Sequence, residues 1–516
     1  MKRNVGWVAL MAALVYGANF WGPSVYILDE AKNAGCALEM WQSGNWVVPY
    51  FNGELRTDKP PLHYFFMMLA YSVFGVAPFA ARLFSVVCGV LLVVHAYVFT
   101  AKHFGRQMAW VVVLILLSSL QLAIQFHLAV PDPYLILCFF SGLLFFYEGY
   151  QGEPRSLYLF YAACALGFLA KGLVAVVFPG LIVLLFLVIQ KQLTLTHLRT
   201  LKLPSGILIF CAIAVPWYLA VGMLTDGLWL EGFFLKHNLS RYTQTMEGHR
   251  GFPFAPFVIL LAGLLPASLF AGPAVRLAWR TRRRKPFLLL CICAVVVVPA
   301  FFSFSKTLLP GYPAPALPFL AILLAFYFQN RFLPGMQPRA GHYVLLVVHV
   351  LIVCAIPVAT YFALQQELPG WNVAPVAGIF IPLAVTGALG LLFYHQKKRR
   401  NSFLALTGGW VITSVLFFWV AFPAVDKTNA VVNSSAYVRE PVAYYKDFNP
   451  AYRFRLTSNL PALQSAEAVT EFLESGGTVI TQARYLDELD TLANQLVFSQ
   501  KDLFEKQVTV VVRKRN

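Results

Sequence analysis

Long runs of apolar residues alternate with short polar loops along most of this chain. Each of these runs is long enough to cross roughly 30 Å of hydrocarbon as a helix. A shorter apolar stretch, 61–78, needs separate treatment. The pattern predicts about thirteen transmembrane helices, near residues 5–26, 81–101, 108–128, 133–150, 157–170, 173–190, 205–223, 254–273, 286–303, 313–329, 342–363, 375–395 and 403–422.

Lysine and arginine gather in alternate loops, which predicts the orientation of the chain. With the N-terminus inside, the inner loops hold the basic runs 282–285 and 397–400, and the outer loops hold far fewer cations. An excess of cations on the cytoplasmic side is the positive-inside rule. This orientation holds only if 61–78 does not cross the membrane. We therefore expect 61–78 to lie in the outer interface, within a first outer loop that spans 27–80.

The pattern changes after residue 422, where the chain becomes polar. Residues 477–481 and 507–512 alternate as strands do, and 467–473 reads as a helix. The predicted fold is therefore an all-α polytopic membrane protein with a small C-terminal α/β domain on the periplasmic side. Residues 1–422 form the transmembrane catalytic domain in this interpretation, and 423–516 form the soluble domain.

Composition supports a membrane protein and excludes one class of partner. Hydrophobic residues make up 59% of the chain and charged residues only 12%, whereas soluble domains contain about 25% charged residues. The net charge of +17 would suggest nucleic acid in a soluble protein. Here the cations lie in short loops between apolar runs, so the positive-inside rule explains them. We expect membrane lipids as partners, and no nucleic acid.

The predicted outer loops carry the residues that can do chemistry. Each of these residues could instead have a purely structural role, because acidic side chains cap helices and lysines extend to lipid headgroups. Together they bring carboxylates for proton transfer and cations for an anionic group to one face of the membrane. In chain order these candidates are Asp29, Glu30, Lys59, Asp132, His237, Arg241, Lys306 and Tyr312.

The order of these motifs resembles one known family. It comprises the bacterial lipid-carrier-dependent glycosyltransferases of the GT-C superfamily, which include protein O-mannosyltransferase-like enzymes and the aminoarabinose transferases that modify lipid A. The resemblance covers roughly residues 5–330. Its motifs are the acidic pair 29–30, the Lys-Pro-Pro-Leu element 59–62, the lone Asp132, the His-Asn-Leu-x-Arg-Tyr stretch 237–242 and the Ser-Lys-Thr-x-Leu-Pro-x-Tyr element 305–312.

The resemblance implies a function and a role for each candidate. The sugar donor would be carried on a polyprenyl phosphate such as undecaprenyl phosphate. The acceptor would be lipid A, another envelope glycolipid or a secreted protein, at the periplasmic face of the bacterial inner membrane. Asp29 would be the general base, beside the further catalytic candidates Glu30 and Asp132. The residues that bind the donor and its phosphate would be Lys59, Arg241, Lys306, His237 and Tyr312.

Three positions depart from the family pattern. Leu308 stands where many members have lysine, Asp58 replaces a common glutamate, and Lys236-His237-Asn238 matches only part of a histidine pattern linked to zinc. No specific cofactor is predicted, and a divalent metal stays open. Two other functions also stay open, a transporter or lipid flippase and a glycan-chain ligase. A transporter would keep ionisable residues near the bilayer midplane, whereas here they lie in outer loops.

The predicted topology can be tested by cysteine labelling in a cysteine-free background. A cysteine introduced by Arg283→Cys should be shielded from a membrane-impermeant thiol reagent, because residue 283 lies in a cytoplasmic loop. A cysteine introduced by Ser458→Cys should react. The reverse pattern would overturn the orientation and move the candidate site to the cytoplasm.

Overall fold

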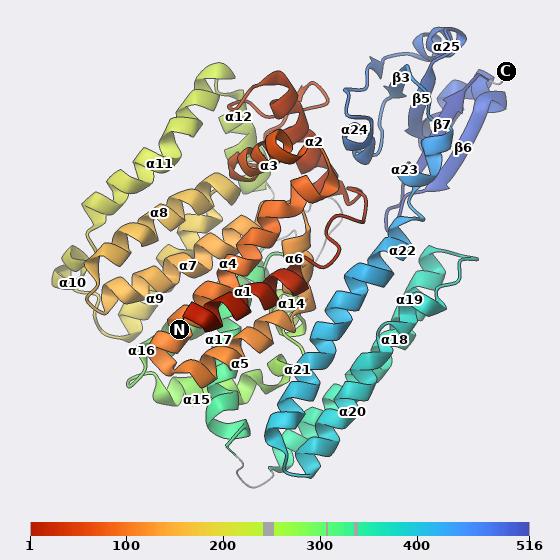
Figure 1. Ribbon diagram of the computed structural model, residues 1–516. Helices are drawn as coiled ribbons and strands as arrows, with labels where there is room; N and C mark the ends of the chain where they lie inside the picture. Colours follow the sequence, from red (N-terminus) through yellow and green to blue (C-terminus); the bar gives the residue numbers. More distant parts are fainter. Residues whose placement is uncertain (1, 241–251, 306–307, 335–338, 515–516) are drawn as a thin grey trace.

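The computed structural model describes residues 2–240, 252–305, 308–334 and 339–514, and helices dominate it (Figure 1). The first half of the chain supplies most of the main helix bundle. Its helices outside the first outer loop are α1 (Lys2–Tyr16), α4 (Pro78–Phe104), α5 (Arg106–Leu117), α6 (Leu120–His127), α7 (Asp132–Tyr150), α8 (Pro154–Lys171), α9 (Val174–Ile189), α10 (Leu195–Thr200), α11 (Leu203–Leu224) and α12 (Leu228–Glu231).

The second half completes the bundle and adds a separate group, α18 to α21, along one side (Figure 1). The elements before the C-terminal sheet are η1 (Gly232–Ser240), α14 (Ala255–Ala262), η2 (Ala267–Phe270), α15 (Ala271–Thr281), α16 (Pro286–Ser303), η3 (Ala314–Ala316), α17 (Leu317–Tyr327), η4 (Phe328–Phe332), α18 (Ala340–Glu367), α19 (Ala374–Gly378), α20 (Ile381–His395), α21 (Arg399–Leu416), η5 (Phe417–Ala421), α22 (Phe422–Asp426), α23 (Ala430–Asn433) and η6 (Ser434–Ala436).

Within the described residues, seven helices are long and apolar enough to cross a membrane. The number rises to nine if each of two bent helix pairs forms one span. The prediction of a mostly helical, multi-span membrane protein is therefore confirmed. The count of about thirteen spans stays a prediction, because it includes shorter apolar helices such as α1 and α9.

The structure corrects two of the predicted spans, because neither is one straight helix. Within 108–128, α5 and α6 meet at 67°, and the Ser119 hydroxyl caps the new helix by accepting a bond from the Leu122 amide. Within 254–273, the chain turns by 119° between α14 and the helix that follows. Pro266 lies at this second bend, and proline has no amide hydrogen with which to continue a helix.

The first outer loop is built from two helices and a short hairpin. Helix α2 (Leu28–Ser43) is followed by strands β1 (Tyr50–Phe51) and β2 (Glu54–Leu55) and by helix α3 (Leu62–Phe74). At 1.5 Å per residue α3 is only about 20 Å long, which is too short to cross the hydrocarbon alone. Its length agrees with an interfacial helix, and its place in the membrane stays a prediction.

A five-stranded sheet follows the last long helix. The strand order is β4-β3-β5-β7-β6, with β3 parallel to β4 and β5, and β7 antiparallel to β5 and β6. Strands β5 and β7 and helix α25 fall where the sequence predicted strands and a helix. The elements are β3 (Val442–Tyr445), α24 (Ala451–Leu456), β4 (Ala462–Leu463), α25 (Ala466–Glu474), β5 (Thr478–Gln482), η7 (Ala483–Gln495), β6 (Leu496–Lys501) and β7 (Val508–Arg513).

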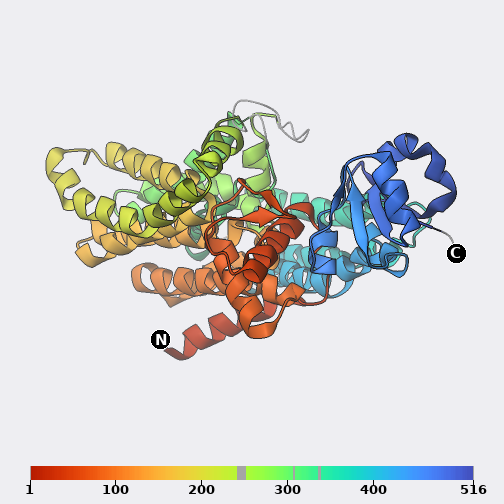
Figure 2. The same ribbon diagram turned by 90° about the horizontal axis from the view of Figure 1, so that it is seen from above.

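Hydrogen bonds attach this C-terminal segment to the first outer loop. The Asn52 side chain donates to the Leu460 carbonyl at 3.0 Å and accepts from the Leu460 amide at 2.7 Å. The Arg453 guanidinium donates to the Gln42 side chain at 2.9 Å. Seen from above, the sheet lies at one end of the molecule (Figure 2). Whether 423–516 is an independent domain stays a prediction.

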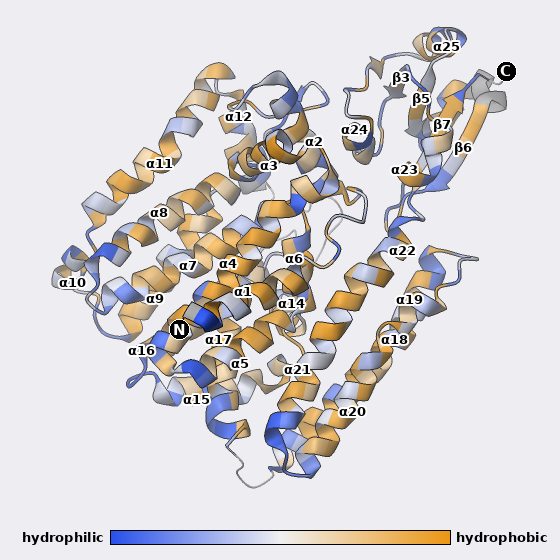
Figure 3. Ribbon diagram, in the orientation of Figure 1, coloured by the Kyte–Doolittle hydropathy of each residue, from blue (hydrophilic) through white to orange (hydrophobic). Residues whose placement is uncertain are grey.

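Polar residues mark the two ends of the helix bundle. In Figure 3 hydrophilic residues gather around α15 and at the junction of α20 and α21. This end of the bundle lies opposite the end that carries α2, α3 and the sheet. The basic runs 282–285 and 397–400 follow α15 and α20 in the chain. The two basic runs thus share one end of the bundle, and which end faces the cytoplasm stays a prediction.

A buried ion pair joins three segments of the outer end. Glu30 and Arg82 are fully buried, and two guanidinium nitrogens donate to the Glu30 carboxylate at 2.7 and 2.8 Å. Glu30 also accepts from the Ala129 amide at 2.9 Å, in the loop before α7. Arg82 donates further to the carbonyls of Phe20, Pro23 and Ser24. The start of α2, the first turns of α4 and the loop 128–131 are thereby held together.

We expect Glu30→Gln to destabilise the folded protein strongly. The change leaves the Arg82 guanidinium buried without its counter-charge, which typically costs about 3–5 kcal/mol. The measurement is thermal unfolding in detergent. Glu488→Gln is the matched control, because Glu488 pairs with Lys446 on the protein surface, where ion pairs contribute little. Equal, small losses of thermal stability in both variants would contradict the role of Glu30.

Candidate active site

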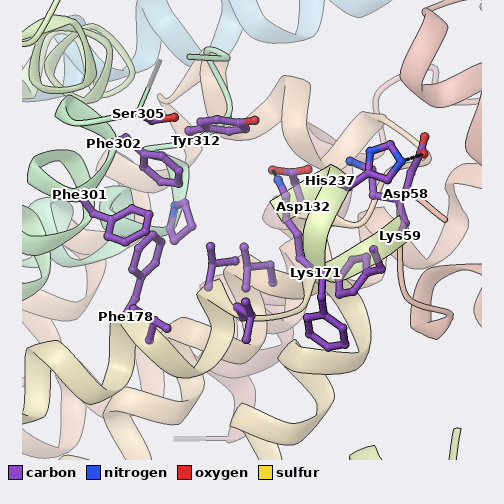
Figure 4. A pocket seen from close by; sticks show the side chains of 17 residues that line it. Asp58, Lys59, Asp132, Lys171, Phe178, His237, Phe301, Phe302, Ser305 and Tyr312 are labelled. Carbon is purple, nitrogen blue, oxygen red and sulfur yellow. Dashed lines mark hydrogen bonds and ion pairs between the residues drawn. The ribbon is translucent and has the colours of Figure 1, made fainter. Parts of the chain in front are cut away.

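A cavity of about 450 Å³ opens at the end of the bundle that carries α2 and α3 (Figure 4). One part of its wall is polar and lies near the first outer loop and the ends of α7, α8 and α16. The remainder is apolar and includes the rings of Phe178, Phe301 and Phe302. The polar lining residues are Asp58, Lys59, Asp132, Lys171, His237, Ser305 and Tyr312.

Two antiparallel helix ends bring Asp132 and Lys171 together. Asp132 is the first residue of α7, and Lys171 is the last residue of α8. Each sits where the helix dipole favours its charge. The Lys171 ammonium lies 2.6 Å from the Asp132 carboxylate, and both side chains are mostly buried. Lys171 also lies 5.5 Å from the centre of the Tyr312 ring, so the pair forms a charged patch on the cavity wall.

A second charged group joins the first outer loop to the segment after α12. The Asp58 carboxylate accepts from the His237 ring at 3.0 Å and lies 3.6 Å from the Arg56 guanidinium. Burial would raise the pKa of Asp58. The hydrogen bond from His237 and the charge of Arg56 outweigh burial, so the pKa falls well below the usual value of 3.8. Asp58 is therefore ionised throughout the neutral range.

Asp29 lies beside the cavity and does not line it. Its carboxylate is half-exposed and lies 4.0 Å from the Lys59 ammonium, which does line the cavity. Burial would raise the pKa of Asp29, but the charges of Lys59, Arg56 and Lys171 hold it below the usual value of 3.8. Asp29 is therefore a carboxylate at neutral pH, with one side open to solvent.

The structure brings most of the described predicted site residues to one cavity, and it places Glu30 away from that cavity. Lys59, Asp132, His237 and Tyr312 surround one cavity, and Asp29 stands at its edge. Glu30 is instead buried in the ion pair with Arg82, where it supports the positions of its neighbours. Arg241 and Lys306 lie outside the described residues.

Two charged cavity residues, Asp58 and Lys171, had no role assigned in the predicted set. Asp58 immediately precedes Lys59, and Lys171 ends a predicted span on the outer side. The position of each residue in the sequence was therefore a reason to expect it near the site. That reason was weak, because the partners of these residues come from distant segments and become visible only when the helix ends are paired.

The residues offer only limited support for a metal site. Within the described ranges no group of three or more His, Cys, Asp or Glu residues lies close enough to hold a metal ion. The Asp58 and His237 pair is the nearest match to the metal-linked pattern in the sequence, and it supplies two ligand atoms. A divalent metal at this position stays a prediction.

The cavity can hold a molecule with an anionic head and an apolar tail. Lys59 and Lys171 offer ammonium groups at the polar end, and phenylalanine rings line the opposite end. Such a division suits an amphipathic ligand at the membrane surface, since cations bind phosphate oxygens and apolar walls accept hydrocarbon. The Asp29 carboxylate, at the edge, is ionised and half-exposed to solvent.

Comparisons of sequence find one matching family and several relatives. Residues 58–219 match the family described as dolichyl-phosphate-mannose-protein mannosyltransferase. The undecaprenyl phosphate-alpha-4-amino-4-deoxy-L-arabinose arabinosyl transferase of Yersinia pestis is 31% identical over 335 residues, which is 62% of this chain and 58% of the relative. An uncharacterized protein of Aquifex aeolicus is 29% identical over 64% of this chain and 75% of its own length. This chain therefore spans less than two thirds of the length of the curated transferase.

Comparison of structures extends the likeness to nearly the whole chain. ArnT from Cupriavidus metallidurans, solved with bound undecaprenyl phosphate, covers 98% of both chains with a TM-score of 0.79 at 21% identity. The oligosaccharyltransferase AglB of Archaeoglobus fulgidus is more distant, with a TM-score of 0.51 at 12% identity. The resemblance drawn from the motifs is thus confirmed: this chain is similar to the aminoarabinose transferases and the mannosyltransferase family, and it has the GT-C fold.

Proposed function

We propose that this protein is a membrane glycosyltransferase. It moves a sugar from a polyprenyl phosphate carrier, such as undecaprenyl phosphate, to an envelope acceptor. The acceptor is lipid A, another glycolipid or a secreted protein. The observation that carries this proposal is the polar and apolar division of the outer cavity, with Lys59 and Lys171 at one end and phenylalanine rings at the other.

The donor suits this cavity in charge and in shape. A polyprenyl phosphate places its anion at the level of the lipid headgroups and its tail in the hydrocarbon. Lys59 and Lys171 provide cations at the polar end, and His237 adds a ring nitrogen there. Arg241 and Lys306 are further candidates from the same predicted outer face. Guanidinium and ammonium groups both bind phosphate oxygens well.

The reaction is a displacement at the anomeric carbon of the sugar. An acceptor hydroxyl or phosphate oxygen forms the new bond to this carbon, and the bond from the carbon to the carrier phosphate breaks. Asp29 accepts the proton of an acceptor hydroxyl as general base. Asp132 orients the acceptor or a sugar hydroxyl. Cations near the carrier stabilise the charge that returns to the polyprenyl phosphate as it leaves.

The proposal includes a place and a topology for the enzyme. We propose about thirteen spans in a bacterial inner membrane, with α2, the cavity and a C-terminal α/β domain of residues 423–516 facing the periplasm. The basic runs on the opposite end of the bundle support this orientation. Glycosyl transfer on that face requires no soluble nucleotide-sugar, because the lipid carrier brings the sugar to the site.

Replacing Asp29 by asparagine tests the general base. Asp29→Asn keeps the size and hydrogen-bonding capacity of the side chain and removes its basicity. Turnover should fall by roughly 10²–10⁴-fold, the usual contribution of such a group. The measurement is the rate of sugar transfer by purified protein that keeps its thermal stability. A properly folded Asp29→Asn enzyme with near-normal turnover would rule out this role.

Donor titration tests the phosphate site. Lys59→Ala and Arg241→Ala should each weaken the use of the donor by about 1.5–3 kcal/mol, the range for hydrogen bonds to charged groups. Acceptor kinetics should hardly change. Lys32→Ala is the matched control, because Lys32 is an exposed lysine of α2 that does not line the cavity. Unchanged donor kinetics in both test variants would end the proposal that these cations hold the phosphate.

The pH profile of turnover tests the electrostatics of Asp29. A base acts when it is deprotonated, so the lowered pKa of Asp29 should extend turnover to lower pH than an ordinary aspartate would allow. Lys59→Ala removes a nearby positive charge and leaves Asp29 buried on one side, so its pKa should rise. At saturating donor, the acidic side of the pH profile of turnover should move to higher pH in Lys59→Ala. It should stay in place in Lys32→Ala. An unmoved profile in both variants would contradict the coupling of Asp29 to Lys59.

A further inference from the structure

A second cavity, of about 590 Å³, lies at the opposite end of the bundle, between the main helices and the α18 to α21 group. Its walls come from α5, from η4 with the two residues after it, and from α21. Helices α5 and α21 begin at the end of the bundle that carries the basic runs. This cavity therefore lies at the other end of the bundle from the 450 Å³ cavity of the candidate active site. The lining residues are Gln107, Trp110, Val111, Leu114, Gln329, Leu333, Pro334, Arg400, Phe403 and Leu404.

This groove is polar at its mouth and apolar farther along the helices. The α5 residues follow helical spacing and form one face. Gln107 lies in the first turn of α5, and Leu114 lies two turns deeper. Arg400 likewise lies in the first turn of α21, and Leu404, 42% exposed, follows one turn later. Gln329 donates to Gln107 at 2.9 Å across the mouth.

Positive charge at this mouth is not balanced by acids. Lys397, Lys398 and Arg400 are exposed, and no carboxylate of the described residues forms an ion pair with them. The neighbouring Arg399 is buried against the Tyr394 ring, 3.4 Å from its centre. Its Nη2 has no hydrogen-bond partner among the described atoms. Of the cations 397–400 only Arg400 lines the groove, and the other three are its neighbours in the chain, so the charged side chain of the groove is a cation without an acidic partner among the described residues.

We propose that this groove binds an anionic glycerophospholipid of the cytoplasmic leaflet. The lipid phosphate lies at Arg400 and the Gln107 and Gln329 amides, and an acyl chain runs along Val111, Leu114 and Leu404. Trp110 stands between the two parts, where tryptophan is favoured at the membrane interface. A neutral solute would leave the charge of Arg400 unbalanced, and a soluble anion would leave the apolar walls exposed. Basic pockets between helices on the cytoplasmic side suit anionic headgroups.

The bound lipid would connect two groups of helices by packing between them. Helix α5 belongs to the main bundle, and α21 belongs to the group along its side (Figure 1). An acyl chain between them fills space that protein side chains leave open. The site rests on the proposed orientation, which puts this end of the bundle at the cytoplasmic leaflet, but not on the proposed glycosyl transfer. Anionic lipid should therefore stabilise the protein whatever reaction it catalyses.

Native mass spectrometry of the full chain, released from vesicles of defined composition, tests this site. The probes are phosphatidylglycerol, phosphatidylcholine with the same acyl chains, and undecaprenyl phosphate. We expect retained phosphatidylglycerol, a higher thermal midpoint in its presence, and no such effect of phosphatidylcholine. Equal retention of both phospholipids would overturn the charge assignment. Preferential displacement of phosphatidylglycerol by undecaprenyl phosphate would show that the groove belongs to the carrier and overturn the proposal.

Two variants and a matched control locate the lipid. Arg400→Gln should weaken phosphatidylglycerol binding roughly fivefold, the effect of one cation beside an anionic membrane lipid. Leu404→Trp fills the apolar part and should remove the retained lipid while the charges stay. Arg283→Gln removes an exposed cation of another inner loop that does not line the groove, and it should leave binding unchanged. Equal weakening by Arg400→Gln and Arg283→Gln, or full retention in Leu404→Trp, would refute the site.

Discussion

The carboxylate of Glu30 fixes the outer end of this molecule. A charged pair taken out of water is tolerable only when its geometry is good and its remaining bonds are satisfied. Glu30 and Arg82 meet this condition by bonding to each other, to the Ala129 amide and to three carbonyls before α2. Since Asp29 precedes Glu30 and Asp132 follows Ala129 by three residues, the same pair holds two carboxylates of the candidate site, Asp29 and Asp132, in place.

The separation of charged and apolar residues at the site follows from where charges can exist in a membrane. Ionised side chains are expensive in the hydrocarbon, so they gather where helices end. The ends of α7 and α8 supply the Asp132 and Lys171 pair, and the first outer loop supplies Asp29, Asp58 and Lys59. The apolar walls of the cavity come mostly from α9, η1 and α16. A ligand with a phosphate head and a hydrocarbon tail therefore meets both of its requirements in one cavity.

Sequence alone predicts the features that depend on local pattern. Hydropathy gives the helical membrane fold, alternation gives strands β5 and β7, and loop motifs name Lys59, Asp132, His237 and Tyr312, which the structure gathers around one cavity. Features that depend on distant partners are missed. The break at Pro266 is hidden inside a continuous apolar run. The structural place of Glu30 is visible only beside Arg82, and that of Lys171 only beside Asp132. The roles of these residues in a reaction stay predictions.

The most direct test of the account compares the cell envelope of the source organism with and without this gene. Mass spectrometry of glycolipids and secreted glycoproteins should show one sugar-modified species that disappears without the gene and returns when it is restored. Without the gene, the polyprenyl phosphate carrier should accumulate with the sugar still attached. An unchanged set of glycolipids and glycoproteins would contradict the account. Redistribution of a lipid between the two leaflets, with no sugar lost from any acceptor, would point to a flippase.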